Sequence, residues 1–178
     1  MRIRMNITTI EKNSVHNYNL YSSNLIRENH EAFYNECFLA KDRFDKGFIN
    51  LSSTWTYRYY NIFSLTAGSI LFYDLMAQIN FVARDFLQTE EPLWFQSWLN
   101  FHKQDEVLQW HDHKTCSCHG YISIEPMETK TIFKDYEVLN EVGKIYIGQP
   151  YKSHKVEVLQ KFEKPRITIA FDILRQKD

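Results

Sequence analysis

The stretch RITIAFDI, residues 166–173, alternates two kinds of side chain and predicts the last strand of this chain. Successive side chains of a strand point to opposite faces, so Arg166, Thr168, Ala170 and Asp172 share one face and apolar side chains share the other. Six further runs rich in β-branched and aromatic residues precede it. They are LWFQSWLNF (93–101), EVLQWH (106–111), GYISI (120–124), KTIF (130–133), KIYIG (144–148) and HKVEVL (154–159). Short strands at regular spacing predict an antiparallel sandwich or barrel.

The sequence before Pro92 has a helical period instead. Apolar residues at positions 71, 75, 79, 82 and 86 lie on one face of a helix expected over 69–87. A shorter helix is expected over 31–44, whereas residues 1–21 fit either a strand or a loosely held arm. Helices followed by strands favour an α+β chain, mainly β, whose helices buttress one face of the sheet.

Composition excludes several classes of protein. With 178 residues, 44% of them hydrophobic, the chain is long enough for one domain with its own core. Its 21 basic and 22 acidic side chains nearly cancel, which argues against binding nucleic acid or anionic membranes by bulk electrostatics. No apolar run is long enough for a membrane span, and residues 1–20 do not resemble a secretory signal. Three cysteines do not make a disulfide framework, so a cytoplasmic protein is expected.

Histidines are concentrated in WHDHKTCSCH, residues 110–119. In an extended segment His111 and His113 point the same way, so both can reach one metal ion. His154 opens a later predicted strand, and Arg166 opens the last one. A non-haem Fe(II) site needs ligands on one side and open positions on the other. An arginine on a neighbouring strand provides a fork of donors for a carboxylate.

This ordered set of residues resembles the 2-oxoglutarate and Fe(II)-dependent oxygenase superfamily. It is most similar to small oxygenases common in phage genomes, which carry W-H-x-H, then H-G-Y, a distal histidine and a closing R-I-T-I-A-F-D; the resemblance covers residues 93–173. It implies a double-stranded β-helix, that is, a cupin-like jelly roll. We therefore expect a single domain over 1–178, with a helical part over 1–90 and a jelly-roll core with the metal site over 91–178.

The resemblance also assigns roles to individual residues. His111, His113 and His154 are expected to hold Fe(II). Arg166, helped by Thr168, is expected to bind the distal carboxylate of the cosubstrate 2-oxoglutarate. Tyr121 is a candidate hydrogen-bond donor to the same molecule. The activity implied is a dioxygenase, most simply a hydroxylase of an unknown substrate, with 2-oxoglutarate as its small-molecule cosubstrate.

One departure from the superfamily pattern leaves alternatives open. Its usual ligand carboxylate is replaced here by His113. Three imidazoles can hold the metal, Asp112 can reach it through a local bulge, or the site has lost activity. Strand alternation favours three imidazoles, because a bulge is a special feature that one sequence does not reveal.

Less specific interpretations stand beside these. His102 and His119 are expected to be structural, and Asn100 a polar residue near a strand end. A zinc site that includes Cys116 and Cys118 is disfavoured, because all its ligands would lie within a few residues.

The alternative function is a non-catalytic or zinc-binding cupin-like module. A weaker alternative is a three-histidine dioxygenase that needs no 2-oxoglutarate. The aromatic residues over 55–63 are expected in the core, or in a lid.

Overall fold

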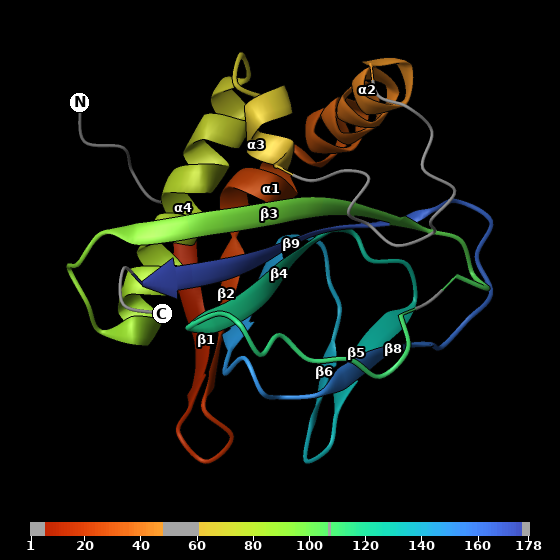
Figure 1. Ribbon diagram of the computed structural model, residues 1–178. Coiled ribbons are helices and arrows are strands. Elements are labelled where there is room, and N and C mark those ends of the chain that lie inside the picture. The colour runs from red at the N-terminus through yellow and green to blue at the C-terminus, as the bar shows by residue number, and fades with distance from the viewer. Residues whose placement is uncertain (1–5, 48–60, 107, 176–178) are drawn as a thin grey trace.

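The computed structural model describes residues 6–47, 61–106 and 108–175 (Figure 1). Its helices are α1 (Asn24–Glu28), α2 (His30–Gly47), α3 (Ile62–Leu65) and α4 (Ile70–Leu87). Its strands are β1 (Ile7–Asn13), β2 (Tyr18–Ser23), β3 (Leu93–His102), β4 (Cys118–Glu125), β5 (Thr129–Phe133), β6 (Glu137–Leu139), β7 (Lys144–Gly148), β8 (His154–Val158) and β9 (Arg166–Arg175).

The strands form two antiparallel sheets. The large sheet has the order β1-β2-β7-β4-β9-β3 and the small sheet has the order β6-β5-β8. In Figure 1 the helices cover one face of the large sheet, and the small sheet lies on its other side. The chain is therefore mainly β, with an antiparallel jelly roll buttressed by helices. The fold class predicted from the sequence is confirmed.

Strand β9 lies inside the large sheet and separates two cores. Its apolar residues, together with those of β4 and β7, pack against the helices in a fully buried cluster that includes Ile122, Ile147, Ile169 and Phe171. Its other face looks into the space between the sheets, where Ala170 packs beside aromatic residues such as Tyr146. This is the alternation predicted for residues 166–173, and it directs Arg166 and Thr168 away from the helices.

Helix α4 begins and packs as the sequence predicts. The Ser69 hydroxyl accepts a hydrogen bond from the Phe72 amide and thereby caps the first turn. Leu75, Ile79 and Val82 are fully buried in the core against the sheet. Within the described ranges, no helix combines the length and the apolar character needed to cross a membrane.

Two parts of the chain differ from the expectation. Residues 7–23, which the sequence left undecided, form the hairpin β1–β2, and β2 pairs with β7 in the large sheet. The helical description of residues 1–90 is therefore wrong for this hairpin. Residues 108–111 belong to no named strand, although the run 106–111 was expected to form one: His111 forms an isolated bridge with His154, and the Leu108 carbonyl accepts from the Val156 amide. The aromatic stretch over 55–60 lies outside the described residues.

Candidate metal centre and anion pocket

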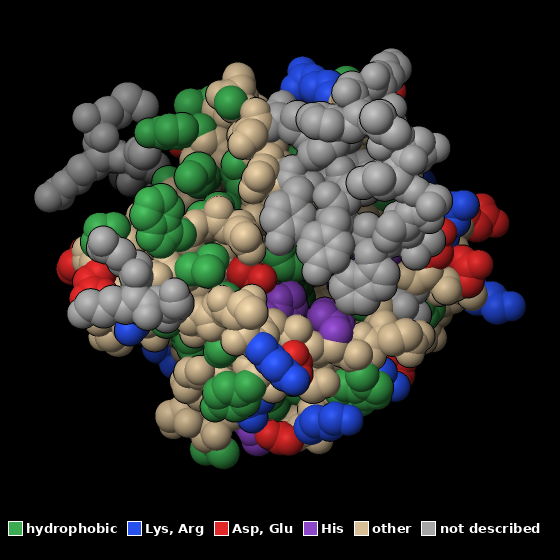
Figure 2. Space-filling view, viewed as in Figure 1, with side chains coloured by type: hydrophobic (Ala, Val, Ile, Leu, Met, Phe, Trp, Pro, Cys, Tyr) green, Lys and Arg blue, Asp and Glu red, His purple; other side chains and the backbone are tan. Residues whose placement is uncertain are grey.

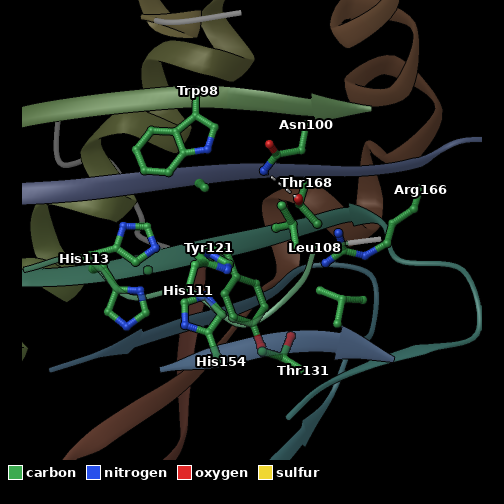
Figure 3. A pocket seen from close by; sticks show the side chains of 14 residues that line it. Trp98, Asn100, Leu108, His111, His113, Tyr121, Thr131, His154, Arg166 and Thr168 are labelled. Atoms are coloured by element: carbon green, nitrogen blue, oxygen red, sulfur yellow. Dashed lines mark hydrogen bonds between the residues drawn. The ribbon is translucent and has the colours of Figure 1, made fainter. Parts of the chain in front are cut away.

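A partly open pocket lies between the two sheets, and the empty space at its position is about 400 Å³ when adjoining open solvent is included. Figure 3 shows its two ends: histidine side chains gather at one end and Arg166 lies at the other, with Tyr121 and Thr131 between them. Histidine side chains also reach the molecular surface near the centre of the face shown in Figure 2. The residues expected to form the site thus line one cavity, although they come from β4, β8, β9 and the loop after β3.

Three histidines form a compact cluster in this pocket. One ring nitrogen from each of His111, His113 and His154 lies within 4.8 Å of the other two. The backbone fixes two of these residues relative to each other, because the amide of His111 donates to the carbonyl of His154 (3.0 Å) and the amide of His154 donates back (2.9 Å). Imidazole nitrogens at this spacing are suited to binding one Zn, Fe, Cu or Ni ion.

Hydrogen bonds to the Nδ1 atoms prepare these rings for a metal. His111 Nδ1 lies 2.8 Å from the carbonyl of Gln109, and His154 Nδ1 lies 3.1 Å from the carbonyl of Lys152. A carbonyl can only accept, so each Nδ1 carries the proton and each Nε2 keeps a lone pair. Ligating histidines usually have this arrangement, with a partner on the nitrogen that does not bind the metal.

The third ring has a different partner. His113 Nδ1 lies 2.9 Å from Oδ1 of Asp172, on β9. Alternation along residues 166–173 predicts Asp172 on the same face of the strand as Arg166, but no local pattern assigns Asp172 to the site. Its carboxylate contacts the cluster through the ring of His113.

Burial keeps two of the three rings, those of His154 and His111, uncharged at neutral pH. It lowers the pKa of His154 to about 3, with a further contribution from the nearby His111, and it also lowers the pKa of His111. Neutral imidazole is the form that binds a metal ion. The donor set therefore fits a divalent transition metal.

The other end of the pocket carries a buried positive charge. Arg166 is 3% exposed, and its Nε and Nη1 atoms have no hydrogen-bond partner in the described part of the chain. Burial lowers its pKa to about 10, so the guanidinium remains protonated at neutral pH. No described aspartate or glutamate forms an ion pair with it, and the residues that line the pocket include no acidic side chain. A buried charge of this kind is costly unless an anion pairs with it.

Polar groups surround the space between the two ends. Asn100 Nδ2 donates to Thr168 Oγ1 across β3 and β9, at 3.2 Å. Thr168 thereby accepts with its hydroxyl oxygen and keeps a proton to donate. The buried hydroxyl of Tyr121 and Oδ1 of Asn100 make no well-aligned hydrogen bond within the described ranges. The positions expected for cosubstrate contacts, Arg166, Thr168 and Tyr121, all line the pocket.

Two further residues were expected to be structural, and one of them lines the pocket. His119 stacks on His113, with ring centroids 4.5 Å apart and planes 17° apart. Burial, followed by the nearby His154, lowers the pKa of His119 well below its usual value. Its buried Nε2 has no partner in the described part of the chain. His119 is the histidine of the H-G-Y motif, which it forms with Gly120 and Tyr121, and this motif is the sequence signal for its place in the site. His102 is buried outside the pocket lining.

The rival ligands lie elsewhere. Asp112 is outside the three-histidine group, is exposed, and has Lys114 as a partner at 3.6 Å. Cys116 Sγ donates to the backbone carbonyl of His113, and Cys118 is buried in the core against the helices. In the described part of the chain the group that could hold a metal ion therefore consists of histidines alone, and the geometry favours His113 over Asp112 as a candidate ligand.

Comparison with known proteins gives the fold. No family model matches the chain, and no curated protein matches its sequence. Among solved structures, it is similar to SnoK, a non-haem α-ketoglutarate-dependent carbocyclase of nogalamycin biosynthesis, at 12% identity and a TM-score of 0.63, over 90% of this chain and 80% of that one. It is similar to a Pseudomonas putida prolyl-4-hydroxylase at 10% identity and a TM-score of 0.60, over 92% and 90% of the two chains.

A third similar structure contains a metal. Iron-bound HygX from Streptomyces hygroscopicus matches at 13% identity and a TM-score of 0.59, over 90% of this chain and 83% of that one. The shared architecture is that of the non-haem oxygenases that use Fe(II) and α-ketoglutarate, which is another name for 2-oxoglutarate. At these identities the likeness concerns the fold.

Proposed function

We propose that this protein is an Fe(II)- and 2-oxoglutarate-dependent dioxygenase that hydroxylates a small-molecule substrate. The observation that carries the proposal is a pocket with three histidines that could hold a metal ion at one end and, at the other, a buried arginine that has no carboxylate partner among the described residues. A small molecule that chelates a metal through one end and has a carboxylate at the other satisfies both ends. 2-Oxoglutarate has this structure.

Each residue has a defined task in this proposal. His111, His113 and His154 hold Fe(II) through their unprotonated nitrogens. The Arg166 guanidinium pairs with the distal carboxylate, while the Thr168 and Tyr121 hydroxyls donate hydrogen bonds to the same molecule. The apolar side chains of Trp98, Leu108, Val156 and Ala170 complete the lining and keep bulk water away from the reacting groups. When bound, Fe(II) supplies the oxidising chemistry by which dioxygen and 2-oxoglutarate hydroxylate a C–H bond.

The test is the conversion of 2-oxoglutarate to succinate by purified protein supplied with Fe(II) and ascorbate. Binding of 2-oxoglutarate to the Mn(II)-loaded protein, measured by calorimetry, provides a readout that is independent of turnover. We expect Arg166→Gln to abolish this binding. Arg84→Gln, which removes a surface arginine beside Glu90, should leave it unchanged. Protein that binds metal but neither binds nor consumes 2-oxoglutarate would contradict the proposal.

The same histidines also suit a zinc-binding, non-catalytic module, because three neutral imidazoles are common zinc ligands. That function leaves the buried charge of Arg166 unexplained. Metal analysis of protein purified without chelators separates the two possibilities: one zinc per chain that Fe(II) does not displace would favour the module. Turnover of substrate without 2-oxoglutarate would instead indicate a cosubstrate-independent three-histidine dioxygenase.

A further inference from the structure

The histidine cluster contains no carboxylate among its candidate ligands, but the carboxylate of Asp172 lies next to one of the three rings, that of His113. Asp172 Oδ1 lies 2.9 Å from His113 Nδ1, and the two side chains are only 13% and 12% exposed. Both side chains are thus largely buried. In a buried environment the interaction between a carboxylate and an imidazole is screened less than in water.

The contact distinguishes His113 from its two neighbours. The Nδ1 atoms of His111 and His154 face backbone carbonyls, which are neutral acceptors. Only His113 among the three faces an ionisable side chain at this nitrogen. A carboxylate on the far nitrogen makes an imidazole a more basic ligand and fixes its orientation.

The position of Asp172 follows from the strand that carries it. Arg166, Thr168, Ala170 and Asp172 alternate along the pocket face of β9, so one strand presents a cation at one end and an anion at the other. Three neutral imidazoles leave a divalent ion with its full charge. Asp172 is placed to offset part of that charge through the ring of His113.

We propose that Asp172 is a positioning residue of the metal centre: through His113 it supplies the negative charge that a carboxylate ligand would otherwise supply directly. This inference rests on the proposed metal centre but not on 2-oxoglutarate or turnover. It predicts that metal affinity depends on the charge of Asp172 and not only on its shape.

The opposing explanation is that Asp172 merely tethers the loop of His113 to β9. Asp172→Asn separates the two roles, because an asparagine side chain has nearly the same shape and an oxygen that can accept from Nδ1, but it carries no charge. The probe is Co(II), added to metal-free protein in competition with a chromophoric chelator, with the visible Co(II) spectrum as a second readout. We expect Asp172→Asn to bind Co(II) about 10- to 100-fold more weakly than the wild type.

The matched control is Asp112→Asn. Asp112 is the neighbour of two of the ligands in sequence but is exposed and pairs with Lys114, so its charge should have little effect. A loss in Asp112→Asn as large as that in Asp172→Asn would overturn the inference. Unchanged Co(II) affinity and spectrum in Asp172→Asn would overturn it as well. Thermal unfolding of the metal-free proteins shows whether each variant is folded.

A second background tests the route through the ring. In His113→Asp the imidazole is gone, so Asp172→Asn should no longer weaken Co(II) binding; the same loss in both backgrounds would contradict the proposed route.

Failure of the proposed function gives a different result from failure of this inference. If the wild type and His154→Ala bind Co(II) equally weakly, there is no metal centre and both proposals are wrong. If the wild type and Asp172→Asn both bind Co(II) tightly, only the inference about Asp172 is wrong.

Discussion

His102 and Arg166 are directly paired across the antiparallel ladder of β3 and β9, and both side chains are buried. Directly opposed residues project to the same face of a sheet, so an imidazole lies beside a guanidinium. Burial, and then the positive charge of Arg166, lower the pKa of His102 to about 4. At neutral pH the pair therefore carries one positive charge, on Arg166, and protonation of His102 is unfavourable.

The metal-free protein should lose stability as the pH falls from about 6.5 to 4. In this window the unfolded chain protonates residue 102 and the folded chain does not, so the free energy of unfolding decreases with each step toward acid. For His102 alone the loss is about 3 kcal/mol at most. Urea unfolding at pH 7 and pH 5 measures it. We expect the difference between the two pH values to be smaller in His102→Gln, and equal differences in the two proteins would contradict this assignment.

Replacing Arg166 with methionine should stabilise the metal-free protein while it abolishes binding of 2-oxoglutarate. A buried guanidinium with unpaired Nε and Nη1 atoms is costly to the fold, and methionine fills similar space without a charge. We expect an increase of about 1 kcal/mol or more in the free energy of unfolding. Thermal unfolding with and without 2-oxoglutarate measures both effects. A variant less stable than the wild type would show that Arg166 serves the fold and not a ligand.

Thr168 should be sensitive to loss of its hydroxyl rather than to its size. Thr168→Val leaves the buried Nδ2 of Asn100 without its acceptor, which costs about 1–3 kcal/mol of stability. Thr168→Ser keeps the acceptor and is the matched control. Urea unfolding of both variants gives the comparison, and a valine variant as stable as the serine variant would contradict the role assigned to this hydrogen bond.

Local sequence patterns were sufficient to predict the strand of Arg166 and the facing of its side chains. Alternation in residues 166–173 depends on the strand period alone, which no distant contact alters. The same holds for α4, whose apolar spacing and Ser69 cap are local signals. The gathering of His111, His113 and His154 was expected from the resemblance together with the alternation of residues 111 and 113.

Other features depend on contacts between distant segments. Asp172 was placed on the correct face, but its contact with His113 depends on how the loop after β3 crosses β9. Residues 106–111 have the composition of a strand, yet the described residues 108–111 belong to no named strand: Leu108 accepts from Val156, and His111 pairs with His154 in an isolated bridge. The strand β1 is a largely exposed edge of the sheet, so it lacks the apolar alternation that would have revealed it.

Gly120 should tolerate no side chain, because neighbouring atoms occupy the space that a side chain would need. A Cβ atom at this position would collide with the ring of Phe171 and the backbone carbonyl of Tyr146. Neither can move freely, since Phe171 is fully buried and Tyr146 belongs to the adjacent strand of the sheet.

We therefore expect Gly120→Ala to lower the free energy of unfolding by about 1–3 kcal/mol. It should also weaken Co(II) binding, because His119, which stacks on the proposed ligand His113, precedes it directly. Gly68→Ala is the control, since a Cβ atom there meets nothing within 4 Å. Thermal unfolding and Co(II) titration of the two variants decide the matter. Equal behaviour of Gly120→Ala and Gly68→Ala would show that the sheet can open at residue 120 and that its packing does not hold the site in place.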